Sequence, residues 1–222
     1  AGNTYLISSS KTTIQVIPAS GAAAYDIGGP FNSPVGMALD KAGNLYVAER
    51  TALYKVVPAT GTTTPVTDIT LASATSIAAD DYGNLYIVNR RRIYKYEIGT
   101  GNFNEIDTRI AGVVNIAVKG NTVYYSVLIS SQQAIFQMSL DGSNRSIVTQ
   151  PDGFAVDGDL TGHAYGGGLT NISRYGGDDG LILNVGAAYN LSTDLKGNIY
   201  YAATQDSLVK KLTPSGGYFI DK

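Results

Sequence analysis

A short motif, Gly-Asn-x-Tyr or a close variant of it, recurs six times along this chain of 222 residues. The motif glycines are Gly2, Gly43, Gly83, Gly120, Gly162 and Gly197, so the unit repeats about every 40 residues. Repeats of this length are typical of proteins in which each unit packs on its neighbours along the chain. The period therefore restricts the fold to a repeat architecture more strongly than any other feature of the sequence.

Each motif lies inside a longer unit of four short runs that are rich in β-branched and aromatic residues. In the second unit a small apolar run, 36–39, precedes the motif, and a run rich in tyrosine and valine, 45–48, overlaps and follows it. A third run, 53–57, leads into a Pro-x-x-Gly turn, and a more polar run, 62–69, ends the unit. Such runs, bounded by Gly, Asn, Asp and Pro, predict strands, and no stretch shows helical periodicity over three turns. Four strands in each unit predict the blade of a β-propeller.

The predicted fold is therefore an all-β, six-bladed β-propeller that occupies residues 1–222 as a single domain. The blade units are expected at 1–30, 31–71, 72–111, 112–149, 150–186 and 187–222. The first motif begins at Gly2, so no run precedes it that could form an innermost strand. We expect three strands in the first blade and four in each of the others, and we expect the chain to be part of a longer polypeptide.

Two residue types in the repeat are expected to be structural. The inner run ends in Asp40, Asp80 and Asp194 in the second, third and sixth units. The corresponding inner run of the fifth unit ends in Asp157. An aspartate beside a glycine turn can accept hydrogen bonds from the turn backbone, and a calcium or magnesium role is the alternative. The motif tyrosines are expected to pack between blades with a polar tip; they are Tyr46, Tyr86, Tyr124, Tyr165 and Tyr200.

The composition excludes several kinds of active site. The chain has no cysteine and a single histidine, His163, which excludes a thiol nucleophile, a cysteine-ligated metal and a multi-histidine metal site. With one histidine and no nucleophile elbow around a serine, there is also no Ser-His-Asp set. A net charge of −2 gives no general attraction to nucleic acid. No apolar run reaches the roughly 18 residues that a membrane-spanning helix needs.

Residues 34–50 closely resemble the NHL repeat, which forms one blade of six-bladed propellers, and residues 75–90 are a second good match. Residues 113–128 and 188–204 match more loosely, and residues 151–167 depart from the pattern. The resemblance implies the propeller fold for essentially the whole chain. It does not imply one function, because some members are sensor domains and others are adhesion or scaffold modules that bind proteins, RNA or glycans.

Related six-bladed propellers are enzymes, and the resemblance implies what each would need. Amidating lyases bind zinc through several histidines, which this chain lacks. Streptogramin lyases use a histidine near a metal, whereas His163 lies in a turn between the first and second strands of its unit. Lactonases of the gluconolactonase type use a glutamate, an asparagine and aspartates around a central divalent metal, and no such set occurs here in matching motif context.

The turns that carry the motif are short and repetitive, whereas the loops expected on the opposite face are irregular. Loops on a rigid scaffold commonly carry function. On that face Arg90, Arg91 and Arg92 precede a strand expected at 93–96, and Arg50 occupies the same position one unit earlier. Arginines in a loop can hold a carboxylate, a phosphate or a glycan acid through paired hydrogen bonds. These four arginines are candidate ligand-binding residues, and a solvated turn is the alternative.

A second candidate group lies where the inner strands begin, near the expected mouth of the central channel. It consists of Asn115, Asp152, Tyr189 and Asn190, which could surround a small ligand or a cation. Capping of the strand backbone is the alternative for these residues. No catalytic or metal-ligating residue is assigned, and no cofactor is expected apart from a divalent cation in the channel as an open alternative.

These observations favour a non-enzymatic module of the sensor, adhesion or scaffold type. It would bind a protein, a glycan or a small ligand, but not nucleic acid, through its irregular loop face and channel mouth. The low charge and the many Ser, Thr, Asn and Gly residues are compatible with an extracellular, cell-surface or periplasmic location. The alternative is a metal-dependent enzyme of the lactonase or lyase type, with its site at the central channel.

Overall fold

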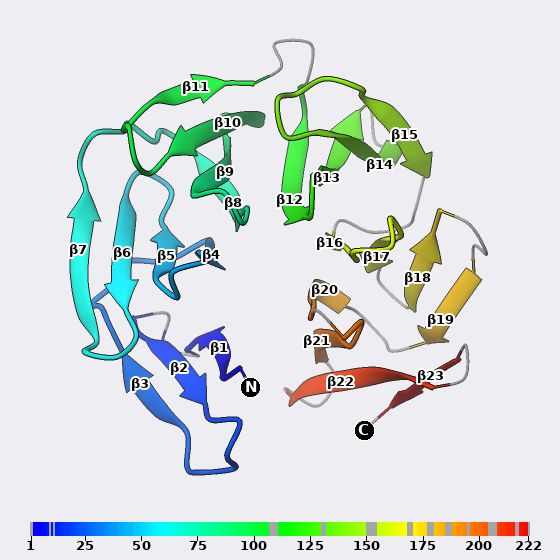
Figure 1. Ribbon diagram of the computed structural model, residues 1–222, viewed down its shortest axis with the longest axis horizontal. Helices are drawn as coiled ribbons and strands as arrows, with labels where there is room; N and C mark the ends of the chain where they lie inside the picture. The colour runs from blue at the N-terminus through cyan, green and yellow to red at the C-terminus, as the bar shows by residue number, and fades with distance from the viewer. Residues whose placement is uncertain are drawn as a thin grey trace. The chain divides into compact units, whose positions relative to one another are not determined.

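The computed structural model describes most of the chain as β-structure. The described residues are 2–8, 10, 12–106, 111–129, 132–149, 155–167, 171–176, 180–184, 188–194, 196–203, 208–215 and 218–221. Within them 23 strands form six antiparallel sheets, and no residue is helical (Figure 1). The chain divides into two compact units, Ala1–Glu105 and Ile106–Lys222, each of which holds three sheets.

The first unit contains one three-stranded and two four-stranded sheets. The first sheet consists of β1 (Thr4–Ile7), β2 (Ile14–Ile17) and β3 (Tyr25–Ile27). The second consists of β4 (Gly36–Leu39), β5 (Leu45–Ala48), β6 (Leu53–Val57) and β7 (Thr62–Val66). The third consists of β8 (Ala74–Ala79), β9 (Asn84–Asn89), β10 (Arg92–Glu97) and β11 (Phe103–Glu105).

The second unit contains three four-stranded sheets. The fourth sheet of the chain consists of β12 (Val113–Lys119), β13 (Thr122–Ile129), β14 (Gln132–Ser139) and β15 (Ser146–Thr149). The fifth consists of β16 (Ala155–Gly158), β17 (Ala164–Gly167), β18 (Asn171–Tyr175) and β19 (Gly180–Asn184). The sixth consists of β20 (Ala188–Thr193), β21 (Ile199–Ala203), β22 (Leu208–Ser215) and β23 (Tyr218–Asp221).

The strand content confirms the prediction of one three-stranded and five four-stranded units. In every sheet each strand pairs with the strand next to it in sequence, so the sheets are simple meanders. In the second sheet burial falls from the second strand to the fourth: all four residues of β5 are buried, whereas β7 is mostly exposed. The polar outer strand therefore leaves a hydrophilic edge, which discourages pairing with another chain.

Neighbouring sheets of each unit pack through their inner strands and the motif tyrosines. In the first unit β4 packs on β8, and Tyr46 shares an apolar cluster with Ala74 and Ile77 of the next sheet. In the second unit β12 packs on β16 and β16 on β20, and Tyr165 packs with Leu191. These contacts agree with the expected packing between blades. Four of the motif tyrosines are buried, with exposed fractions of 3% or less: Tyr46, Tyr86, Tyr124 and Tyr165.

The sixth sheet departs from this tyrosine pattern. Tyr200, which occupies the motif position, is only half-buried, and the adjacent Tyr201 is 2% exposed instead. Tyr201 belongs to the apolar cluster that joins the fifth and sixth sheets. Because successive residues of a strand face opposite sides, the buried aromatic ring of this sheet comes from the opposite face of β21.

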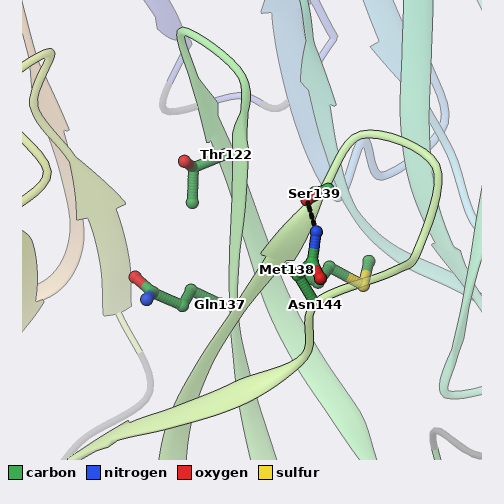
Figure 2. Close-up of a pocket in the computed structure, with 5 residues that line it drawn as sticks. All are labelled: Thr122, Gln137, Met138, Ser139 and Asn144. Atoms are coloured by element: carbon green, nitrogen blue, oxygen red, sulfur yellow. Dashed lines mark hydrogen bonds between the residues drawn. The ribbon is translucent and has the colours of Figure 1, made fainter.

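A shallow hollow with a volume of about 150 Å³ lies beside β13 and β14 of the fourth sheet. It is lined by Thr122, Gln137, Met138, Ser139 and Asn144 (Figure 2). The Nδ2 atom of Asn144 donates a hydrogen bond to the Oγ atom of Ser139, at 3.1 Å. In Figure 2 Thr122 and Gln137 extend away from this bonded pair, so the polar groups do not converge on one point.

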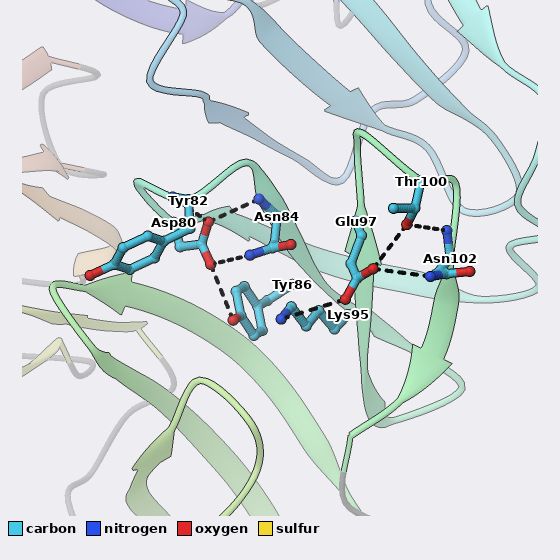
Figure 3. A network of polar contacts seen from close by, with 8 residues as sticks. All are labelled: Asp80, Tyr82, Asn84, Tyr86, Lys95, Glu97, Thr100 and Asn102. Carbon is cyan, nitrogen blue, oxygen red and sulfur yellow. Dashed lines mark hydrogen bonds and ion pairs between the residues drawn. The ribbon is translucent and has the colours of Figure 1, made fainter.

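The turn after the inner strand is held by an aspartate in four sheets. In the third sheet the Oδ1 atom of Asp80 accepts hydrogen bonds from the amides of Tyr82 and Asn84, both at 2.9 Å (Figure 3). Its Oδ2 atom accepts bonds from Asn84 Nδ2 at 2.7 Å and from the Tyr86 hydroxyl at 3.3 Å. The same i to i+4 bond from amide to carboxylate forms at Asp40, Asp159 and Asp194.

These bonds support the structural role expected for Asp40, Asp80 and Asp194. In the fifth sheet Asp159 makes the turn contacts, so the turn aspartate lies two residues after Asp157, at which the inner run was expected to end. Asp159 lies three residues before its motif glycine, Gly162, as Asp80 does before Gly83. Asp157 therefore remains inside strand β16, where it has a different environment.

Candidate functional site

Arg90 and Arg91 form the two-residue connection between β9 and β10, and both have a left-handed backbone. Their φ angles are 53° and 62°, and Asn89 pairs with Arg92 across the hairpin. Two consecutive positive φ angles are the pattern of a type I′ turn, which normally contains Asn-Gly. A side chain with a Cβ atom costs roughly 1–2 kcal/mol in this region. Both arginines are exposed, so the turn presents two cations on a strained backbone.

The segment beneath this turn is fixed by a buried side chain. Asn89, which is 4% exposed, accepts hydrogen bonds at its Oδ1 atom from the amides of Ala72 and Ser73, at 3.0 and 3.1 Å. In the second sheet Glu49, at 8% exposure, has the same role and accepts a bond from the amide of Asn32. A buried polar group at the end of the second strand thus anchors the loop that enters the same sheet.

Arg50 lies on the other side of the same loop. The Arg50 carbonyl accepts a hydrogen bond from the amide of Ala74 at 2.9 Å, and the Arg90 amide donates to the carbonyl of Ser73 at 3.3 Å. The peptide between Ser73 and Ala74 therefore lies between the backbones of Arg50 and Arg90. Two of the candidate arginines from different sheets are brought together in this way, and the side chain of Arg50 is exposed.

Arg92 has a different environment from the other candidate arginines. Its Nη1 atom lies 2.7 Å from Oε1 of Glu105, on the neighbouring strand β11. The hydrogen bond to Glu105, together with the negative charge of that carboxylate, raises the pKa of Arg92 above its ordinary value. The positive charge of Arg92 is therefore balanced within its own sheet. We define the loop surface by the remaining three arginines, Arg50, Arg90 and Arg91.

The second candidate group is only partly described. Asn115 lies in β12 and Asn190 in β20, on separate inner strands that both pack on β16. Each lies beside a shift of strand register, and Asn115 Oδ1 accepts a bond from the amide of Ile116 at 2.9 Å. Asp152 lies outside the described residues, and only the backbone of Tyr189 is described. The described part of the chain contains no group of three His, Cys, Asp or Glu residues that could hold a metal ion.

Sequence reasoning missed a polar network that joins the inner strands of the second unit. Asp157 of β16 is 5% exposed, and its Oδ2 atom lies 3.8 Å from Nζ of Lys119 in β12. The same oxygen accepts a hydrogen bond from the amide of Thr193 in β20, at 2.5 Å. Lys119 Nζ also donates to the carbonyl of Thr193, at 2.6 Å. Three successive inner strands are thus connected by one lysine and one aspartate.

Burial dominates the titration of Asp157. Removal from water raises the pKa of this carboxyl, and it outweighs the lowering by Lys119 and by the amides of Thr193 and Gly158. Asp159, two residues further on, behaves in the opposite way. Burial also acts to raise its pKa, but the hydrogen bonds from Thr161, Tyr165 and His163 lower it to about 2.

The sequence did contain a signal for this network. In the second, third and fourth sheets an alanine of the inner strand pairs with the motif tyrosine of the next strand. These alanines are Ala38, Ala78 and Ala117. In the fifth sheet the residue in this position is Asp157. In the fourth unit Lys119 ends the inner strand, where other units have an aspartate. Asp157 thus stands where other sheets have alanine, and Lys119 stands where other units have aspartate. The charges of these two unusual residues balance each other.

His163 has the place in the turn that was expected for it. Its Nδ1 atom lies 3.1 Å from Asp159 Oδ2 and 2.8 Å from Thr161 Oγ1, and its amide donates to Asp159 Oδ1 at 3.0 Å. The imidazole therefore replaces the asparagine side chain of the other turns. This arrangement gives the single histidine of the chain a structural environment.

Solved structures that are similar to this chain include one from a complex of two named proteins. A chain in the crystal structure of a nidogen/laminin complex matches with a TM-score of 0.78 and 15% identity, over 95% of this chain and 89% of that chain. No protein-family model and no curated protein match the sequence. At this level of identity the similarity shows the fold alone. Together with the six sheets, it identifies the fold as an all-β, six-bladed β-propeller.

Proposed function

We propose that this chain is a non-enzymatic binding module, built on NHL-type repeats, that holds a protein partner on the loop surface of Arg50, Arg90 and Arg91. The observation that carries this proposal is the left-handed backbone of two consecutive, exposed arginines. Strained backbone positions are retained where they serve a function, because a residue without the strain would otherwise be favoured. An Asn-Gly pair would relieve the strain and remove both cations.

The surroundings of the turn support a binding role. The backbone bonds that join Arg50 to Ala74 and Arg90 to Ser73, together with the anchor at Asn89, hold the loop surface in one arrangement. A binding surface that is ordered before its partner arrives loses little conformational entropy on association. Guanidinium groups also form paired hydrogen bonds with anionic groups. The loop surface therefore combines fixed geometry with a ligand-binding chemistry.

Two further observations bear on the type of module. Residues 34–50 and 75–90, which resemble the NHL repeat, include the inner strand β4, all but the first residue of the inner strand β8, and the adjoining strands β5 and β9. The structurally similar chain comes from a complex of two proteins, nidogen and laminin, which supports a protein as the partner here. We propose a sensor, adhesion or scaffold role at the cell surface or outside the cell. The low charge and high content of small polar residues support this location.

Comparative partner capture tests the proposal. The wild-type chain, an R90N/R91G variant and an R145Q variant are immobilised and exposed to the same surface-protein extract, and retained proteins are identified by mass spectrometry. Arg145 is a matched control, because it is an exposed arginine of the second unit. We expect one or a few proteins to be retained by wild type and R145Q but not by R90N/R91G. Equal retention by all three chains would contradict the proposal.

A further inference from the structure

We infer that Asn144 is an acceptor for N-linked glycosylation and that its oligosaccharide covers the outer strand of the fourth sheet. The inference rests on the location outside the cell that the proposed function includes, and not on the loop surface. Asn144-Arg145-Ser146 is one of three Asn-x-Ser triplets in the chain, and such a triplet is the acceptor signal of secreted proteins. Three observations single it out: its exposure in a turn, the hollow beside Asn144 and the apolar character of β15.

The turn between β14 and β15 presents this triplet to solvent. The side chains of Asn144, Arg145 and Ser146 are all exposed. Asn144 has a φ angle of 54°, in the left-handed region that asparagine adopts more readily than most residues. The amide of Ser139 donates to the carbonyl of Ser143 at 2.9 Å, which holds the turn together. A bulky group on Asn144 would therefore project from a formed turn without displacing packed side chains.

The other two Asn-x-Ser triplets lie inside strands. Asn171 begins β18, the third strand of the fifth sheet, and Ser173 of the same triplet is 9% exposed. Asn190 and Ser192 belong to the inner strand β20, which packs on β16. Acceptor asparagines belong to surface loops, and a bulky oligosaccharide on either strand would interfere with the packing around it. The structure therefore favours Asn144 over Asn171 and Asn190.

The side chain of Asn144 can be modified without losing its hydrogen bond. Its Nδ2 atom donates to Ser139 Oγ at 3.1 Å, and an asparagine amide has two N–H donors. Transfer from a lipid-linked oligosaccharide pyrophosphate forms a bond between Nδ2 and the anomeric carbon of the first sugar. The bond from that carbon to the pyrophosphate oxygen breaks, and Nδ2 loses one proton. The second N–H remains, so the glycosylated side chain can still donate to Ser139.

The hollow beside Asn144 offers contacts for the first sugar. Besides Asn144 and Ser139 it is lined by Thr122, Gln137 and Met138. The polar ends of Thr122 and Gln137 lie apart from the bonded pair of Asn144 and Ser139 (Figure 2). Polar groups on different sides of an open hollow suit a sugar, which carries hydroxyl groups around its ring, better than they suit a compact ion.

The strand that follows Asn144 lacks the protection that other sheet edges have. The outer strands of the first unit each contain a charged residue or a proline: Asp26 in β3, Pro65 in β7 and Glu105 in β11. Strand β15 contains neither, and Ile147 within it is 54% exposed. Arg145, just before β15, lies over the ring of Phe136, 6.0 Å from its centroid. An exposed apolar edge favours pairing with another chain, and an oligosaccharide on the adjoining turn would block that contact.

Secretion from cultured animal cells tests the acceptor site. The full chain is secreted behind a cleavable leader as wild type, S146A, S146T, S173A and S192A, and intact masses are measured before and after treatment with peptide N-glycosidase. We expect one oligosaccharide on every chain except S146A. S146T is the matched control, because threonine completes the same acceptor signal. An unmodified wild type, or an oligosaccharide that is lost in S173A or S192A but kept in S146A, would overturn the inference.

Association below the melting temperature tests the cover on β15. Concentrated wild type, S146A and S146A/I147K are incubated, and light scattering measures the growth of aggregates. We expect S146A to aggregate faster than glycosylated wild type, and S146A/I147K to regain the slower rate because a lysine discourages edge pairing. Thermal melts of the three chains establish that the difference does not come from unfolding. Equal aggregation of wild type and S146A would show that the oligosaccharide does not cover this edge.

The outcomes are separable from those of the proposed function. Arg90 and Arg91 are not part of the acceptor triplet, so R90N/R91G should carry the oligosaccharide as wild type does. If wild type captures a protein through Arg90 and Arg91 but remains unmodified after secretion, the glycosylation inference is wrong and the binding module stands. If the chain is glycosylated at Asn144 but R90N/R91G retains the same proteins as wild type, the loop surface is wrong and the acceptor site stands.

Discussion

Lys119 Nζ and Asp157 Oδ2 lie 3.8 Å apart on the neighbouring inner strands β12 and β16. The side chain of Asp157 is 6% exposed and that of Lys119 is 21% exposed, so the lysine keeps access to water that the aspartate lacks. Both groups also bind Thr193 of the next inner strand. The energetic consequences of removing either partner are therefore unequal.

The first prediction concerns this inequality. K119M leaves a buried, charged Asp157 without a counter-ion and should lower the free energy of unfolding by about 3–5 kcal/mol. D157A leaves the Thr193 amide unbonded but lets Lys119 reach water, and it should cost about 1–3 kcal/mol. Urea unfolding of the two single variants and the K119M/D157A double variant measures these values.

The double variant is the control for this pair. Alanine occupies the position of Asp157 in the second, third and fourth sheets, so the double variant restores the pattern of those sheets. We expect it to lose less stability than the sum of the two single variants. Additive losses would show that the lysine and the aspartate do not depend on each other.

The second prediction is that Asp157 and Asp159 titrate on opposite sides of the usual value of 3.8. The folded pKa of Asp159, about 2, is depressed, so its stabilisation is present above pH 3.8 and is lost as the pH falls towards 2. The folded pKa of Asp157 is raised, so its contribution becomes more favourable as the pH falls through that value. Carbon-13 NMR of the side-chain carboxyls measures both midpoints. A midpoint for Asp157 below that of Asp159 would contradict this assignment.

The third prediction concerns the close contact between Gly158 and the ring of Tyr124. A Cβ atom at Gly158 would overlap the Cε2 and Cδ2 atoms of this ring, which comes from the preceding sheet. G158A should therefore destabilise the protein by about 1–3 kcal/mol, as overpacking does. Gly99 has no atom near the equivalent position, so G99A is the matched control and should be close to neutral. Thermal denaturation compares the two, and Y124L should partly rescue G158A because leucine lacks the overlapping ring atoms.

The fourth prediction separates stability from function at the Arg90–Arg91 turn. Asn-Gly adopts positive φ angles more readily than two arginines, so R90N/R91G should stabilise the protein by about 1–2 kcal/mol. Urea unfolding measures the gain. A loss of stability would show that contacts of the arginine side chains outweigh the backbone strain, and it would remove the main reason for assigning a function to this turn.

The repeat pattern predicted the fold because its determinants are local. Runs of β-branched and aromatic residues form strands, and Gly43 or Gly83 supplies the positive φ angle that a tight turn requires. The three strands of the first sheet followed from the absence of a run before Gly2. In contrast, the choice between Tyr200 and Tyr201 depends on which face of β21 meets the neighbouring sheet. The face that is buried depends on contacts between sheets, which the motif alone does not specify.

The sequence identified the candidate arginines by their charge, but it did not reveal that Arg90 and Arg91 have a strained backbone. In the third repeat unit the third run was expected at 93–96, whereas the corresponding strand, β10, begins at Arg92. This single residue decides that only two arginines remain in the connection and that both need positive φ angles. The turn aspartate of the fifth sheet was missed for a related reason, because the inner run was aligned by its polar end, Asp157, instead of its distance from Gly162. Strand ends are set by pairing between strands, which a short run does not define on its own.

The meander topology has a consequence for how the chain reaches its native state. Every sheet pairs strands that are consecutive in sequence, so each pairing closes only a short loop and carries a small entropic cost. Low contact order of this kind favours rapid formation of individual sheets, even in an all-β protein. The bond between Lys119 and Thr193 spans 74 residues and requires the inner strands of three sheets to be in place. It therefore belongs to the last step of assembly in the second unit, when preformed sheets dock against one another.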